Sequence, residues 1–143
     1  MISYENIKTS IEEKNYIALP FSLSRDELVN AAEKFLNFLS LPQETKEVFS
    51  FRISAPRLGG DIGYKRRKQA IGDLDDKEYF HYHPRIQEKY PEMYENKTVK
   101  EFLLAADRIH STATQLMQEI IGAIDTAHPG VYEKFYCGSE IYA

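Results

Sequence analysis

The chain has 143 residues, of which 43% are hydrophobic and 13% aromatic, and this apolar content excludes a disordered chain. The formal net charge of −4 argues against the positive field of a nucleic-acid-binding protein. A single cysteine excludes an intramolecular disulfide, and no apolar run reaches the roughly 18 residues of a membrane span. The N-terminus also lacks the apolar core of a signal peptide. We therefore expect a single cytoplasmic domain over residues 1–143, with neither nucleic acid nor membrane as a partner.

The first 21 residues predict a lead-in and an extended segment. Residues 1–14 are polar and mixed without a clear period, so we expect a poorly defined lead-in there. Residues 15–21, NYIALPF, form a short apolar run that is ended by Pro20. This pattern is typical of a short strand or an extended entry to the next element.

A helix is predicted next. Ser24 and Glu27 form an S-x-x-E capping box at its start. Pro42 disfavours helical geometry at the residue before it, so the helix should end there, and residues 43–49 should add a turn with Pro42 at its first position. The spacing predicts one apolar face made of Leu28, Ala32, Phe35 and Leu39, with Val29 and Leu36 beside it.

The middle of the chain is less regular. Residues 51–60 are rich in glycine, serine and proline and indicate a connector. Gly63 and Tyr64 indicate a short strand, residues 65–75 a loop, and residues 76–80 a short helical or extended segment.

A second long helix is predicted over residues 98–126. Thr98 and Glu101 form another capping box at its start. A broad apolar face follows, which predicts packing inside the chain or against a partner. Its residues are Val99, Phe102, Leu103, Ala106, Ile109, Ala113, Leu116, Met117, Ile120, Ile121 and Ile124. The whole pattern predicts a mainly α fold with a few short strands.

Histidines provide the first candidates for chemistry. His81 and His83 form an H-x-H pair that would face one side of a strand and is a weak metal candidate; the alternative is a pair in an exposed loop. His110 falls on the apolar face of the long helix, where a core or interface histidine with one hydrogen bond is favoured over a base or ligand.

Charged runs provide the others. Residues 65–68, KRRK, are able to bind phosphate or a carboxylate, although a solvated loop is favoured. Binding of nucleic acid is disfavoured because no aromatic residues interleave with these cations. The acids Asp73, Asp75, Asp76 and Glu78 are consistent with a hard cation, or with the acidic first turn of a helix.

Three segments taken in order resemble a known family. Residues 38–49, FLSLPQETKEVF, are similar to the FF-x-LP-x-E-x-K segment of non-haem iron(II), 2-oxoglutarate-dependent oxygenases of the isopenicillin N synthase type. Gly63 and Tyr64 are similar to the GY of that family, and residues 76–80, DKEYF, to its D-x-KE-x-F. The long helix stands where the family has its own long helix, so the resemblance extends over residues 15–143.

The resemblance implies the helical N-terminal domain of such an enzyme, which packs on a double-stranded β-helix that carries the chemistry. In the family, a His-x-Asp/Glu dyad and a distant His hold Fe(II) in that core. No histidine here has an acid two residues later, so we expect no cofactor in this chain and no activity from it alone. By the same resemblance, Tyr64, Arg66 and Arg67 are substrate-side candidates at the mouth of the pocket.

The complete enzyme would be an oxidoreductase that acts on a small molecule with Fe(II) and 2-oxoglutarate. The expected partner of this chain is then the missing catalytic core, as for a fragment, a truncated product or one half of a split protein. The alternative is a non-enzymatic helical interaction module, which would associate with itself or with another protein through the apolar face of the long helix.

Overall fold

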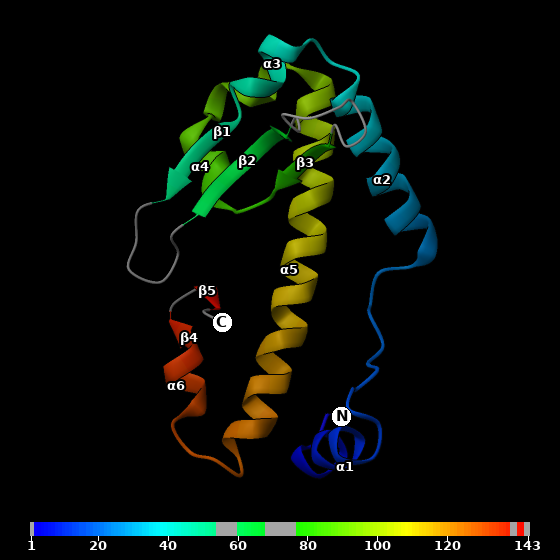
Figure 1. Ribbon diagram of the computed structural model, residues 1–143, viewed down its shortest axis with the longest axis vertical. Helices are drawn as coiled ribbons and strands as arrows, with labels where there is room; N and C mark the ends of the chain where they lie inside the picture. The colour runs from blue at the N-terminus through cyan, green and yellow to red at the C-terminus, as the bar shows by residue number, and fades with distance from the viewer. Residues whose placement is uncertain (1, 54–59, 68–76, 138–139, 142–143) are drawn as a thin grey trace. The chain divides into compact units, whose positions relative to one another are not determined.

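The computed structural model describes residues 2–53, 60–67, 77–137 and 140–141. The chain packs as two compact units, one formed by residues 1–24 and 111–143 and the other by Arg25–His110. We call these the terminal unit and the central unit. Figure 1 shows the order of the elements along the chain.

The fold is mainly α with a few short strands, as the sequence predicts. Its helices are α1 (Tyr4–Lys14), α2 (Arg25–Leu39), α3 (Gln43–Glu47), α4 (Arg85–Lys89), the 3-10 helix η2 (Pro91–Glu95), α5 (Lys97–Asp125) and α6 (Val131–Phe135). Its strands are β1 (Ser50–Ile53), β2 (Gly60–Arg67), β3 (Lys77–His81), β4 (Tyr136–Cys137) and β5 (Glu140–Ile141).

In the central unit, α2 presents a different face to the core from the predicted one. Ala31 and Phe38 are buried, Phe35 and Leu39 are half-buried, and Leu28 and Ala32 are exposed. Apolar residues occupy a broad arc of α2, and the part of that arc at Ala31 and Phe38 faces the core. Two ion pairs also link α2 to α5, Lys34 with Glu101 at 2.6 Å and Arg108 with Glu27 at 2.5 Å.

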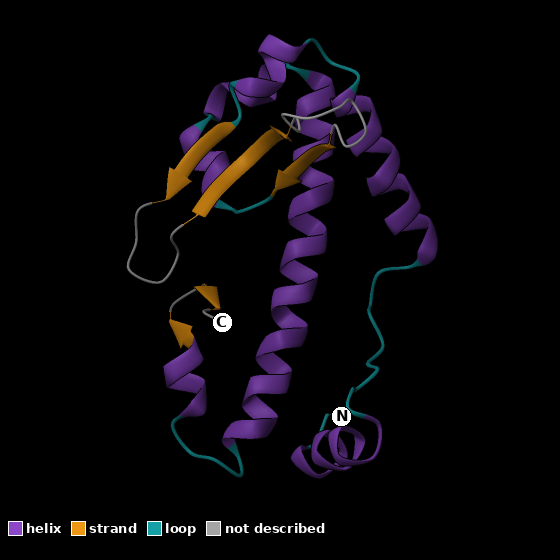
Figure 2. Cartoon of the chain, viewed as in Figure 1, coloured by secondary structure: helices purple, strands orange, loops and turns teal. Residues whose placement is uncertain are grey.

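The sheet of the central unit has the order β1-β2-β3, and both pairings are antiparallel. Residues 65–67, predicted as loop, belong to β2, because β3 pairs with them along its length. Figure 2 shows this sheet in orange. Side chains alternate between its two faces, so Tyr64, Glu78 and Phe80 share the inner face, whereas Lys65, Arg67 and Tyr79 share the outer one.

The inner face packs against the helices of the central unit. Phe38 of α2 lies at the centre, with ring centroids 4.8 Å from Phe102 of α5 and 5.4 Å from Phe80 of β3. The buried core consists of Phe38, Phe49, Tyr64, Ile86, Val99, Phe102 and Leu103. Aromatic residues from α2, α5 and β3 thus make one cluster with edge and tilted contacts.

Helix α5 begins at Lys97, and its cap differs from the predicted one. Asn96 Oδ1 accepts a hydrogen bond from the Val99 N–H at 3.2 Å, so Asn96 and not Thr98 caps the helix. Asparagine is at least as good a cap as threonine, and the capped residue Val99 lies in the buried core. Val99, Phe102 and Leu103 of the predicted apolar face are buried, whereas Met117 is 43% exposed.

The terminal unit contains α1, which replaces the poorly defined lead-in predicted for residues 1–14. Ser3 Oγ accepts from the Asn6 N–H at 3.3 Å, and Asn15 ends the helix in the left-handed region with a φ of 60°. Ile7 is its one buried residue, so the apolar pattern that marks this helix in the sequence is weak. At the other end of the chain, Tyr132 N donates to Asp125 Oδ1 at 2.9 Å. Among the described helices, none combines the length and the hydropathy needed to span a bilayer.

Candidate functional site

Gly63 determines how the middle strand of the sheet meets the end of α3. Its φ is +89°, a conformation that favours glycine, and the adjacent Tyr64 N–H donates to Phe49 O at 2.7 Å. A Cβ atom on residue 63 would lie 1.7 Å from Phe49 O. Only glycine permits this approach, which places the Tyr64 side chain in the core at 2% exposure. Packing therefore explains why a glycine precedes the buried tyrosine at this point of the strand.

Three polar side chains, Lys46, Tyr64 and Glu78, meet beside this core, and we call them the polar cluster. Lys46 Nζ donates to Glu78 Oε1 at 2.5 Å and to Leu39 O at 2.9 Å. The Tyr64 hydroxyl donates to the same carboxylate oxygen, and the hydroxyl oxygen also lies 3.1 Å from Gln43 Oε1. Lys46 is only 5% exposed, so its charge needs the carboxylate as a partner.

The electrostatics of the polar cluster follow from this geometry. Hydrogen bonds from Lys46 and then from Tyr64 lower the pKa of Glu78. Burial by itself would lower the pKa of Lys46, but the hydrogen bond to Glu78 and the nearby negative charge outweigh burial and raise it. Burial and the hydrogen bond to Glu78 raise the pKa of Tyr64.

These shifts describe a cluster that keeps its protons where they are at neutral pH. Glu78 stays ionised, Lys46 stays protonated and Tyr64 stays neutral. A group that exchanges protons during catalysis has a pKa near the working pH, and none of these directions moves a pKa toward neutrality. The polar cluster joins α3, β2 and β3 through hydrogen bonds and one ion pair.

The three substrate-side candidates occupy different environments. Tyr64 points into the core and its hydroxyl is engaged with Glu78. Arg66 is exposed on the same face of the sheet and stands opposite Glu78 in the register, where its charge also lowers the pKa of Glu78. Arg67 is exposed on the outer face, so it alone of the three lies on the side of the sheet away from the core.

The outer face of the sheet gathers cations and rings, and we call it the open sheet face. Its described charged and aromatic side chains are Arg52, Lys65, Arg67, Lys77, Tyr79 and His81. Lys65 stands opposite Tyr79, and Arg67 stands opposite Lys77. The sequence run alone lacks aromatic interleaving, but strand pairing supplies it from β3. The alternation of residues 77–81, KEYFH, was the signal that could have revealed this face.

The weak metal candidates lie at the end of β3. His81 is its last residue, with its ring 5.0 Å from the Tyr79 ring, whereas His83 lies beyond the strand and its Nδ1 accepts from Arg85 N at 3.2 Å. His83 and His110 have ring centroids 6.5 Å apart, and His110 also packs against Tyr82 at 5.6 Å. In the part of the chain that the structure describes, no three His, Cys, Asp or Glu residues are grouped to hold a metal ion.

The remaining charged candidates divide between described and undescribed residues. Lys68, Asp73, Asp75 and Asp76 lie outside the described residues. Glu78, considered with those acids, is the carboxylate that receives Lys46 and Tyr64. Its partners were missed at the sequence level because they are 32 and 14 residues away, although all three stand in the segments that carry the family resemblance.

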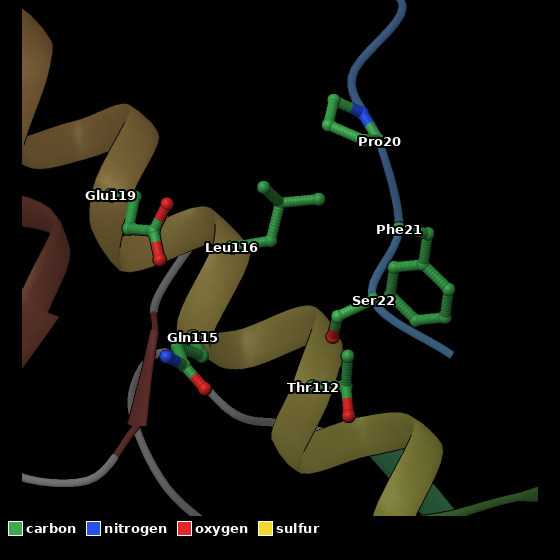
Figure 3. Close-up of a pocket in the computed structure, with 7 residues that line it drawn as sticks. All are labelled: Pro20, Phe21, Ser22, Thr112, Gln115, Leu116 and Glu119. Carbon is green, nitrogen blue, oxygen red and sulfur yellow. The ribbon is translucent and has the colours of Figure 1, made fainter. Parts of the chain in front are cut away.

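The terminal unit carries a small groove of about 160 Å³ between the segment before α2 and the second half of α5 (Figure 3). Glu119, Gln115 and Thr112 line it from α5, and the Ser22 side chain of the extended segment points toward Thr112. The remaining lining residues are Pro20, Phe21 and Leu116. With two exposed α5 side chains among its polar groups, the groove is open to solvent.

Comparison with known proteins gives no assignment: no family model, no curated protein and no solved structure matches this chain.

Proposed function

We propose that this chain is the N-terminal scaffold and substrate-mouth domain of an oxidoreductase, a 2-oxoglutarate- and Fe(II)-dependent oxygenase of the isopenicillin N synthase type that acts on a small molecule. One observation carries the proposal. Each of the three segments that resemble the family contributes one member of the polar cluster: Lys46, Tyr64 and Glu78. Residues that serve one packing arrangement are expected to occur together, so a chance occurrence of three unrelated short motifs is a poorer account.

The iron site of that family does not fit on this chain. Two residues after its four histidines stand His83, Arg85, Thr112 and Gly130, and none of these is an acid. The described residues also contain no metal-binding group of three or more side chains. We therefore assign Fe(II) and 2-oxoglutarate to a β-helical core outside this chain, and we propose that this chain alone is inactive.

The extended segment of the terminal unit supports a sheet as the partner. Ile17, Leu19 and Phe21 are half-buried, whereas Ala18 and Pro20 between them are exposed, which is the alternation of a strand. Within the described residues, no backbone–backbone hydrogen bond involves residues 16–22. Backbone groups in an extended segment of this kind are suited to pairing with the edge of a sheet, such as that of a β-helical core.

A helical interaction module is the second candidate, and exposed apolar side chains favour it. Leu104 and Met117 on α5 are 46% and 43% exposed, and Val29 and Leu36 on α2 are 48% and 61% exposed. Such residues are typical of a surface that another protein covers, including a second copy of this chain.

The first experiment looks for the proposed core. The coding sequence in frame with or beside that of this chain should contain a His-x-Asp/Glu dyad and a distant His. Coexpression of that segment with this chain should yield a complex that converts 2-oxoglutarate to succinate when Fe(II) is added. An adjacent sequence without these residues would favour the interaction module.

The second experiment tests the claim that this chain holds no cofactor. Isothermal titration calorimetry of the chain with Fe(II), and then with 2-oxoglutarate, should give no stoichiometric binding. Tight one-to-one binding of both would contradict the assignment of the iron site to another segment.

A further inference from the structure

The open sheet face concentrates positive charge on an otherwise acidic chain. Lys65, Arg67 and Lys77 lie on neighbouring strands of one face, although the formal net charge of the chain is −4. Arg52 extends the face onto β1, where it stands opposite Asp61 in the register. Arg67 and Lys77 are exposed, so their charges reach solvent from a sheet whose other side is packed. A local excess of positive charge of this kind raises the concentration of anions at the surface.

The two faces of the β2–β3 pair differ in which charges stand opposite each other. On the inner face, Arg66 stands opposite Glu78, which is a favourable cross-strand pair. On the open sheet face, Arg67 stands opposite Lys77, and like charges directly opposite each other disfavour strand pairing. Two cations thus stand opposite each other on the open sheet face, whereas a cation stands opposite an acid on the inner face.

Rings stand next to these cations. Tyr79 lies opposite Lys65 and two residues from Lys77, so its side chain is flanked by positive charge on both strands. The Tyr79 and His81 rings have centroids 5.0 Å apart at 44° to each other. A half-buried tyrosine beside an exposed histidine offers a platform on which a planar group can stack. Lys65, Lys77 and His81 also interact with other groups of the chain, so a ligand would share them.

We propose that the open sheet face binds a small organic anion, with its phosphate or carboxylate at Lys65, Arg67 and Lys77 and its planar ring on Tyr79 and His81. Guanidinium and ammonium groups recognise both anions by charge-assisted hydrogen bonds. The ligand's role as substrate rests on the proposed function, whereas binding itself needs only this chain. The substrate class of the oxygenase would be an anionic molecule with a ring.

The test is an NMR titration of the full ¹⁵N-labelled chain with four probes: phenyl phosphate, benzoate, inorganic phosphate and benzyl alcohol. We expect phenyl phosphate or benzoate to shift the amides of β2 and β3 in a saturable way. Inorganic phosphate and benzyl alcohol should each bind at least tenfold more weakly, because each offers only one of the two contacts. Whichever ring-bearing anion binds more tightly identifies the anionic group, and raised salt should weaken its binding.

Variants locate the site. Arg67→Glu should weaken binding by about tenfold or more, the equivalent of losing one charge-assisted contact. Lys89→Glu is the matched control, because Lys89 is exposed on α4 and the change in net charge is the same. Tyr79→Phe should retain binding and Tyr79→Ala should lose it, while circular dichroism confirms that each variant is folded.

Three results would overturn the proposal: no saturable shift in β2 or β3 with any ring-bearing anion, equal effects of Arg67→Glu and Lys89→Glu, or a preference for single-stranded oligonucleotide over phenyl phosphate. The outcome is separable from that of the proposed function. Anion binding without an oxygenase core refutes the proposed function alone, and a core without anion binding refutes the substrate class alone.

Discussion

Lys46 and Glu78 are 32 residues apart in the sequence, yet Lys46 Nζ and Glu78 Oε1 lie 2.5 Å apart and join α3 to β3. The lysine side chain is 6% exposed and the glutamate side chain 30% exposed. The pair is therefore enclosed on the lysine side and open to water on the glutamate side. Removing either partner has a different consequence from removing both, because a buried ammonium without a counter-charge is strongly unfavourable.

Glu78→Gln should reduce the free energy of unfolding by about 2 kcal/mol, less than for a fully buried pair because Glu78 is partly exposed. Urea unfolding followed by circular dichroism measures it. Glu88→Gln, at an exposed position of α4, is the control and should change stability by less than about 0.5 kcal/mol. The double variant Lys46→Met with Glu78→Gln should recover part of the loss. Equal stability of Glu78→Gln and Glu88→Gln would contradict the role of the pair.

Stability should depend on pH at both ends of the scale. The pKa of Glu78 is lowered from 4.5, so its contribution is complete above that value and is lost as the pH falls through the lower folded value. The pKa values of Tyr64 and Lys46 are raised from 10.0 and 10.5, so their contributions are complete below those values and are lost as the pH rises through the higher folded ones.

Urea unfolding at a series of pH values should therefore give a plateau between about pH 5 and pH 9 with a fall on each side. In Glu78→Gln the loss of stability at acid pH should become smaller. It should not vanish, because the hydrogen bond from Lys34 also lowers the pKa of Glu101. An unchanged acid fall in this variant would show that Glu78 does not carry the expected share.

Alanine substitutions at Gly122, Gly130 and Gly63 should have increasingly unfavourable effects on stability, because an added Cβ meets a different environment at each. Gly122→Ala lies in α5 with no atom within 4 Å of the added Cβ, so it should stabilise by about 1 kcal/mol through helix propensity. Gly130→Ala has the same space but a φ of +93°, and should destabilise by about 1 kcal/mol. Gly63→Ala combines a φ of +89° with a Cβ 1.7 Å from Phe49 O, and should cost more than about 3 kcal/mol.

Thermal and urea unfolding of the three variants check this order. A Gly63→Ala variant that retains the stability of the parent would contradict the close approach of β2 to Phe49. If Gly63→Ala fails to fold, the signs for Gly122→Ala and Gly130→Ala still test the assigned backbone conformations.

The start of α5 is tested by two neighbouring substitutions. Asn96→Ala removes the side-chain oxygen that accepts from the Val99 N–H and should cost about 1 kcal/mol. Thr98→Ala, one position inside the first turn, should change stability by less than about 0.5 kcal/mol. Urea unfolding distinguishes them, and a larger loss for Thr98→Ala would restore the capping box predicted from the sequence.

Local pattern determined the parts of this protein whose contacts are close along the chain. The two long helices, the break before Pro42 and the helical turn of α3 follow from the spacing of apolar residues and from proline, which act within a few residues. The short strand at Gly63 and Tyr64 was also foreseen, although its length was not. Helix α1 was missed because one buried residue, Ile7, gives too weak a period to detect.

Tertiary structure decided what depends on distant partners. Residues 65–67 become strand only because β3 pairs with them, and that pairing brings Tyr79 and His81 to the cations of β2. Likewise, Lys46, Tyr64 and Glu78 are ordinary residues of three separate segments until packing removes Lys46 from water and requires a carboxylate beside it. Charge and hydrogen-bond partners are selected by proximity in space, and sequence spacing does not record that proximity.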